Sequence, residues 1–227
     1  MAALSGKGEP TPDEALRERV LSAVRATPSA PRAVAAPRRA VLLSLASAVS
    51  AALFVALGGV RATGRPPELI AETVGGTILI AIVALGLVLR WGGSMMGPPR
   101  SRLVLLVFIA PLAFLLWKAL CSAQYAGMTA PWPTRPGYRC LLLTLALALA
   151  PLIALFTIRR HSDPSHPLSH GAALGVATGM GAAALVDLWC PVGHLPHVIG
   201  GHVAPALLLG ALGVVLGYLV LAIRSRG

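Results

Sequence analysis

Residues 140–158 have the sequence CLLLTLALALAPLIALFTI, in which no side chain is charged. A transmembrane helix needs about 20 predominantly apolar residues to cross the hydrocarbon core of a bilayer. Inside a bilayer every backbone polar group must be paired within the protein, so a single run of this length is predicted to be a helix rather than a strand. The run therefore indicates a membrane protein.

Five other runs of similar length and composition occur in the chain. The six predicted spans are 40–60, 69–89, 103–121, 140–158, 171–189 and 203–223. The composition agrees, because 56% of the residues are hydrophobic and only 12% are charged, and a soluble domain of this size could not bury so much apolar surface. The first run follows a long polar or mixed segment, which predicts a retained span and not a cleaved signal peptide. The predicted fold is all-α.

The distribution of basic residues predicts the orientation, because Lys and Arg next to a span are retained in the cytoplasm. With a cytoplasmic N-terminus, 14 of the 19 Lys and Arg residues fall in cytoplasmic segments. The remaining 5 are Arg61, Arg65, Lys118, Arg135 and Arg139. We therefore expect both termini in the cytoplasm of a bacterium and the bundle in its inner membrane. The net charge of +11 is then explained by topology and by contact with anionic membrane lipid, so no direct nucleic-acid partner is expected.

Residues 1–39 are predicted to form a cytoplasmic arm that contains one amphipathic helix, 12–26. Thr11 and Glu14 have the spacing of a capping box at the start of this helix. Its apolar stripe consists of Leu16, Val20, Leu21 and Val24. A lone helix of this length is marginal in water, so the stripe should pack either on the membrane or bundle surface, or in a groove of a soluble partner. Residues 28–39, rich in Pro, Ala and Arg, are predicted to be a semi-extended tether.

Thiols and imidazoles gather at the predicted outer face. Its cysteines are Cys121, Cys140 and Cys190, which lie at span ends, and its histidines are His194, His197 and His202, in the last outer loop and at the start of the last span. Such groups favour zinc, copper and other thiophilic ions. In an oxidising compartment the same cysteines could pair as a disulfide. Purely structural roles remain an alternative, since the spacing matches no compact motif such as C-x-x-C.

Asp187 stands one helical turn before Cys190. A carboxylate inside a span is costly and normally has a partner or reaches water. Asp187 could reach the nearby interface, or it could accept a hydrogen bond from a metal-binding histidine and so orient that ligand.

The sequence contains no motif typical of catalysis. It has no phosphate-binding glycine loop, no nucleophile elbow, no H-E-x-x-H pair and no paired carboxylates within the spans. We therefore do not expect an enzyme, and we expect no cofactor apart from a thiophilic metal ion that the outer face could bind. A small transporter or metal-handling membrane protein is the alternative, although its transport path should place more polar groups at mid-bilayer. A haem or redox protein would need paired histidines within the spans, whereas the six histidines lie at span ends or in loops.

Several features together resemble the NrsF-type membrane anti-sigma factors. These are the short arm, the six spans, Arg139-Cys140 followed by Pro151, and a Cys-Pro with a histidine-rich continuation. That continuation is Cys190-Pro191-Val192-Gly193-His194-Leu195-Pro196-His197, followed by Gly201-His202 and Pro205. The resemblance covers most of the chain.

The resemblance implies that the arm holds an extracytoplasmic-function sigma factor at the membrane until a stimulus at the outer face releases it. In that family outer-face cysteines are linked to metal or oxidative stress, and Cys140 and Cys190 are the matching positions. Cys121 has no clear counterpart in the family pattern. The leading prediction is a signalling protein in which outer-face chemistry shifts helix packing and thereby exposes or hides the arm.

Overall fold

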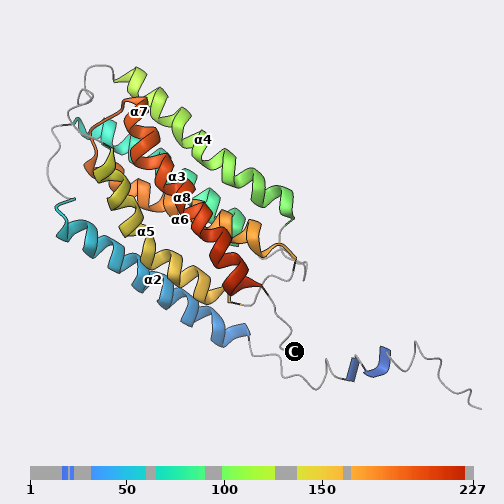
Figure 1. Ribbon diagram of the computed structural model, residues 1–227. Helices are drawn as coiled ribbons and strands as arrows, with labels where there is room; N and C mark the ends of the chain where they lie inside the picture. Colours follow the sequence, from blue (N-terminus) through green and yellow to red (C-terminus); the bar gives the residue numbers. More distant parts are fainter. Residues whose placement is uncertain are drawn as a thin grey trace, which may run out of the picture. The chain divides into compact units, whose positions relative to one another are not determined.

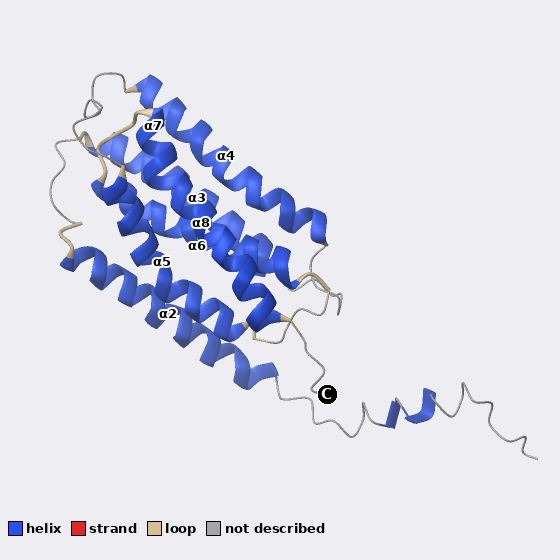
Figure 2. Ribbon diagram, in the orientation of Figure 1, coloured by secondary structure: helices blue, strands red, loops and turns tan. Residues whose placement is uncertain are grey.

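The computed structural model describes residues 17–19, 21–22, 32–59, 65–89, 99–125, 137–160 and 165–222. The chain divides into two compact units, Met1–Ala40 and Val41–Gly227. Throughout the described ranges the secondary structure is helical and no strand occurs, as Figure 2 shows. The all-α prediction is confirmed for this part of the chain.

Among the described residues, six helices are long and apolar enough to cross a membrane, which agrees with the number of predicted spans. Five of them are α2 (Arg32–Ala56), α3 (Pro67–Leu89), α4 (Arg100–Gln124), α5 (Tyr138–Ile158) and α6 (Pro167–Trp189). The sixth runs over Leu195–Leu221. It consists of α7 (Leu195–Val198), a π-helical turn (Ile199–Val203), α8 (Ala204–Leu216) and a second π-helical turn (Gly217–Leu221).

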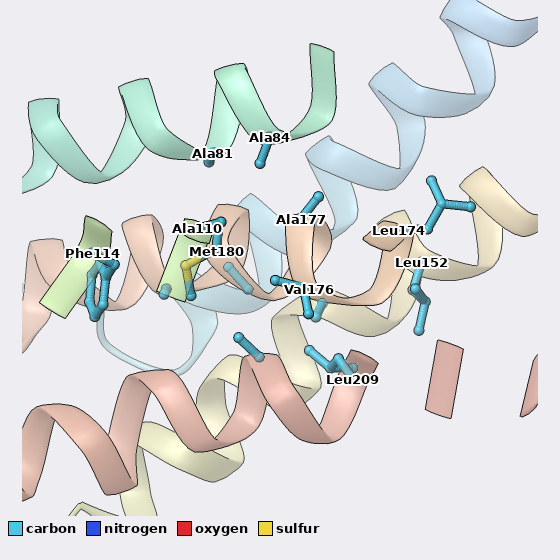
Figure 3. Packing of buried hydrophobic residues seen from close by; sticks show 14 of the residues in the cluster. Ala81, Ala84, Ala110, Phe114, Leu152, Leu174, Val176, Ala177, Met180 and Leu209 are labelled. Atoms are coloured by element: carbon cyan, nitrogen blue, oxygen red, sulfur yellow. The ribbon is translucent and has the colours of Figure 1, made fainter. Parts of the chain in front are cut away.

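Helix α6 is the centre of the bundle. It packs against α3, α4, α5 and α8, with α4 on one side and α5 on the other in Figure 1. Its buried side chains include Leu174, Val176 and Met180, which meet side chains of the surrounding helices in Figure 3. The other helices expose large apolar side chains, among them Ile82 and Phe108. An apolar core with an apolar exterior is what a protein surrounded by lipid needs.

Glycines allow α6 and α8 to approach closely. A Cβ atom added at Gly171 would collide with the backbone of Gly213, and one added at Gly175 would collide with the backbone of Leu209. Small residues four positions apart are common where two membrane helices pack closely. Lipid provides no hydrophobic driving force for helix association, so the pair is stabilised by dispersion contacts between closely spaced backbones. The close α6–α8 pair fixes the helix that carries His202 against the helix that leads to Cys190.

Two boundaries differ from the predicted ones. The last helix begins at Leu195 instead of residue 203, because Pro196 stands in its first turn, where a missing N–H costs nothing. His197 and His202 therefore lie in helical structure, and His197 is not in a loop as predicted. Helix α2 begins at Arg32, with Pro37 inside it. The semi-extended conformation predicted for 28–39 is therefore wrong over 32–39, where Ala and Arg favour helix.

The predicted arm helix, 12–26, lies mostly outside the described residues. Residues 17–19 and 21–22 are helical, and Ser22 Oγ donates to the carbonyl oxygen of Arg19 at 2.9 Å. Leu21 is 44% exposed. Leu16, Val20 and Val24, the other members of the predicted stripe, lie outside the described residues.

Candidate functional site

Four predicted residues from three separate segments meet at one end of the bundle. Cys140 lies in the first turn of α5, Cys190 directly follows α6, His197 lies in α7 and His202 lies in the π-helical turn Ile199–Val203. One potential ligand atom from each of the four lies within 4.8 Å of those of the other three. We call Cys140, Cys190, His197 and His202 the Cys/His cluster.

His197 stands between the two thiols. Its Nε2 lies 3.1 Å from Cys190 Sγ and 3.5 Å from Cys140 Sγ. All four side chains are buried, the two cysteines being 2% exposed and the two histidines 0%. The His202 ring stacks on Phe114, with centroids 6.0 Å apart, so an apolar wall shields this side of the cluster from solvent. A buried site of this kind gives stronger electrostatic interactions than an exposed one.

Local sequence explains how the cluster is assembled. The backbone N–H of Cys190 donates to the carbonyl oxygen of Val186 at 2.8 Å and closes the last turn of α6. Cys190 itself is extended, so the chain leaves the helix there and crosses to α7 in four residues, 191–194. The π-helical turn after α7 then reorients His202 relative to a regular α-helix, an irregularity that is often found at functional sites.

The cluster favours the thiolate form of Cys190. The hydrogen bond with the Cys140 thiol lowers the pKa of the Cys190 thiol well below its usual value. The imidazoles of His197 and His202 act in the same direction, against burial, which raises this pKa. Because the thiolate is the metal ligand and the nucleophile, this environment suits either metal binding or oxidation.

Asp187 lies next to the cluster and is fully buried. Lys118 Nζ donates to Asp187 Oδ1 at 3.1 Å, and Thr77 Oγ1 donates to Asp187 Oδ2 at 2.8 Å. His202 Nδ1 lies 3.5 Å from Oδ1 of the same carboxylate. Asp187 therefore does not reach the interface, which was one of its two predicted roles. Its position beside His202 fits the other, the orientation of a ligand.

Arg65 binds the backbone of the last turn of α6, the turn that carries Asp187. Its guanidinium donates to the backbone carbonyl of Asp187 at 2.7 Å and to that of Leu188 at 3.0 Å. A cation at this position also interacts favourably with the negative end of the helix dipole. Burial lowers the pKa of Arg65, while the charges of Asp187 and Cys190 raise it.

Two predicted site residues lie outside the Cys/His cluster. Cys121, in α4, is buried, and it lines with Cys190 and Lys118 a cavity of about 10 Å³, which is about the space of one water molecule. His194 is exposed at the start of α7. Neither belongs to the group of potential ligand atoms within 4.8 Å.

Lys118 and Thr77 were not among the predicted site residues. The count of basic residues placed Lys118 in an outer segment, whereas it lies inside α4 and is 4% exposed. The sequence did contain an indication, because a charged side chain within an apolar span is costly and normally has a functional role or a partner. Thr77 had no such indication, since a threonine in a span usually bonds to the preceding turn of its own helix.

The comparisons with known proteins identify the family of the chain. Searches of curated proteins and of solved structures found no match. The family model named NrsF, described as a negative regulator of sigma F, matches residues 23–222. That range contains the six described helices that are long and apolar enough to cross a membrane and every residue of the Cys/His cluster. The chain therefore belongs to the NrsF family of negative regulators of sigma F.

Proposed function

We propose that this chain is an anti-sigma factor of the bacterial inner membrane whose Cys/His cluster senses a metal or an oxidant. The cytoplasmic arm holds an extracytoplasmic-function sigma factor, and a reaction at the cluster on the outer face releases it. Membership of a family of negative regulators of sigma F supports the sigma factor as partner. The distribution of basic residues supports the orientation.

The observation that carries this proposal is that the cluster joins three separate segments. Cys140 belongs to α5, Cys190 ends α6, and both histidines belong to the last helix. A metal ion bound by all four side chains pulls these segments into one geometry. A two-electron oxidant such as hydrogen peroxide instead converts the thiols of Cys140 and Cys190 into a disulfide, and the two electrons and two protons pass to the peroxide, which is reduced to two water molecules. Either event favours one packing of the bundle, and a difference of about 1–3 kcal/mol between packings is enough for typical coupling.

Deletion of residues 1–26 tests the sequestration. The truncated and full-length chains are expressed with the cognate sigma factor, solubilised in detergent and purified. We expect the full-length chain to retain the sigma factor and the truncated chain to lose it. Retention by the truncated chain would eliminate the arm as the binding element.

Replacement of the cluster cysteines tests the sensing. We expect Cys140→Ser and Cys190→Ser each to abolish induction of sigma-dependent genes by metals or oxidants. Cys121→Ser is the matched control, since Cys121 is a buried thiol near the cluster but outside the group of four ligand atoms. An unchanged response in the Cys140 and Cys190 variants would contradict the proposed sensor.

A further inference from the structure

The Cys/His cluster has the donor set and the spacing of a tetrahedral metal site. Bond lengths of about 2.3 Å to sulfur and 2.0–2.1 Å to nitrogen place neighbouring donor atoms of such a site about 3.3–3.8 Å apart. The two sulfur–nitrogen distances from His197 Nε2 are 3.1 and 3.5 Å, and all four potential ligand atoms lie within 4.8 Å of one another. Small shifts would therefore complete the tetrahedron.

His202 provides the second observation that indicates a ligand. Its side chain is 0% exposed, yet neither ring nitrogen makes a hydrogen bond among the described residues. A buried polar atom without a partner costs about 1–3 kcal/mol. A metal ion bound at one nitrogen, with a carboxylate at the other, removes that cost at both positions.

We propose that the Cys/His cluster binds one thiophilic divalent cation of the Zn²⁺ and Cd²⁺ class, and that Asp187 is the positioning residue of this site. The inference rests on the proposed function, because it identifies the ligand and the supporting residues of the proposed sensor. Asp187 Oδ1 lies 3.5 Å from His202 Nδ1. When the ion is bound, Nδ1–H donates to Asp187 and Nε2 ligates the metal, an arrangement that fixes the tautomer and orientation of the imidazole.

The charges of the site favour a divalent ion. Two thiolates carry two negative charges and two neutral imidazoles carry none, so one divalent cation makes the four-ligand centre neutral. Asp187 is separately neutralised by Lys118, at 3.1 Å. Neutrality matters here because an uncompensated charge in a buried site is strongly unfavourable. Lys118 therefore lets Asp187 orient His202 without adding net charge to the site.

The tightly packed surroundings hold Asp187 in place. Thr77 of α3 and Lys118 of α4 bind its two side-chain oxygens, and Arg65 binds its backbone carbonyl. Two contacts to the carboxylate and one to the backbone of Asp187 fix the position of the oxygen that faces the His202 imidazole. Metal occupancy is thereby linked to α3 and α4 as well as to the helices that supply the ligands.

Cobalt titration of the full-length chain in detergent micelles tests this inference. Tetrahedral Co²⁺ has intense visible d–d absorption, and thiolate ligands add a charge-transfer band in the near ultraviolet. We expect saturable binding of one Co²⁺ with both signatures, displaced by Zn²⁺ or Cd²⁺ but not by Mg²⁺, which prefers oxygen ligands. Weak octahedral absorption, or the unchanged spectrum in Cys190→Ser, would overturn the metal site.

Asp187→Asn tests the positioning role. We expect Co²⁺ affinity to fall about 10–100-fold, as for other residues that orient metal ligands, while the thiolate charge-transfer band remains at saturation because both thiols are intact. Glu72→Gln is the matched control, since Glu72 is a carboxylate on α3 that accepts a hydrogen bond from Tyr125 instead of contacting the cluster. Affinity within twofold of the unchanged chain in Asp187→Asn would overturn the role of Asp187.

A second variant covers the case in which Asp187→Asn does not fold, since that change leaves Lys118 as a buried unpaired charge. Asp187→Asn combined with Lys118→Gln removes both charges together and should show the same loss of affinity. Failure of the metal site and failure of the proposed function can be distinguished, because sigma-factor retention is measured separately. If the full-length chain retains the sigma factor but binds no Co²⁺, only the metal site is contradicted. If the chain binds Co²⁺ but the arm-deleted chain still retains the sigma factor, only the role of the arm in sequestration is contradicted.

Discussion

Ser50 of α2 donates a 2.7 Å hydrogen bond to the backbone carbonyl of Leu147 in α5. Leu147 precedes Pro151 by four residues, and proline has no N–H to donate to the carbonyl at that position in a helix. Ser50 thus satisfies a carbonyl that Pro151 leaves without its helical donor. The bond joins α5, the helix that carries Cys140, to α2.

Replacement of Ser50 by Ala should weaken this connection. The buried Leu147 carbonyl loses its donor, which costs about 1–3 kcal/mol. We expect a lower Tm in micelles and a changed basal activity of the sigma factor. Ser47→Ala is the matched control, because Ser47 lies one turn earlier on α2 and is exposed. Equal Tm values for the two variants would show that the hydrogen bond from Ser50 to Leu147 does not stabilise the protein.

Enlarging Gly175 should separate α6 from α8. A Cβ at this position meets the backbone of Leu209 and Gly210, which cannot move aside as a flexible side chain could. Overpacking of this kind costs about 1–3 kcal/mol or more. We expect Gly175→Ala to lower the Tm and to weaken Co²⁺ binding, since the displaced last helix carries both cluster histidines. Gly181→Ala on the same helix meets nothing within 4 Å and should leave both measurements unchanged.

Replacing one partner of the Lys118–Asp187 ion pair should lower the stability of the protein more than replacing both partners. Lys118→Met leaves Asp187 as an unpaired buried charge, which costs about 3–5 kcal/mol. In the combination of Lys118→Gln with Asp187→Asn no buried charge remains, and we expect a smaller loss. Thermal unfolding of the two variants beside the unchanged chain measures both effects. A double variant less stable than Lys118→Met would contradict the buried pair.

The orientation can be tested at His194. All three native thiols are at most 3% exposed, so they are poor targets for a bulky reagent. His194→Cys, made with all three native cysteines replaced by Ser, offers an exposed thiol at the cluster end of the bundle. We expect a membrane-impermeant maleimide to label it in intact cells. Ser101→Cys, exposed at the opposite end of α4, should react only after lysis. The reverse pattern would invert the orientation and exclude an outer-face sensor.

Sequence alone determined that the described part of the chain is all-helical and how many of its helices are long and apolar enough to cross a membrane. Runs such as 140–158 are long and uncharged, and the bilayer requires each of them to pair its backbone within a helix. This constraint acts on each segment separately, so it can be recognised without knowledge of any other segment. The same locality explains the error at 32–39, where a composition rich in Pro resembled a tether although Pro37 lies inside α2.

Only the tertiary structure decided which residues form the site. Nothing in the spacing separates Cys121 from Cys140 and Cys190, yet Cys121 stays outside the cluster. Likewise, the sequence does not pair Lys118 with Asp187, although they are 3.1 Å apart. Such contacts depend on the rotation of each helix about its axis and on the close α6–α8 approach, which are set by packing between helices. The local pattern along one helix carries no information about the side chain that a neighbouring helix presents to it.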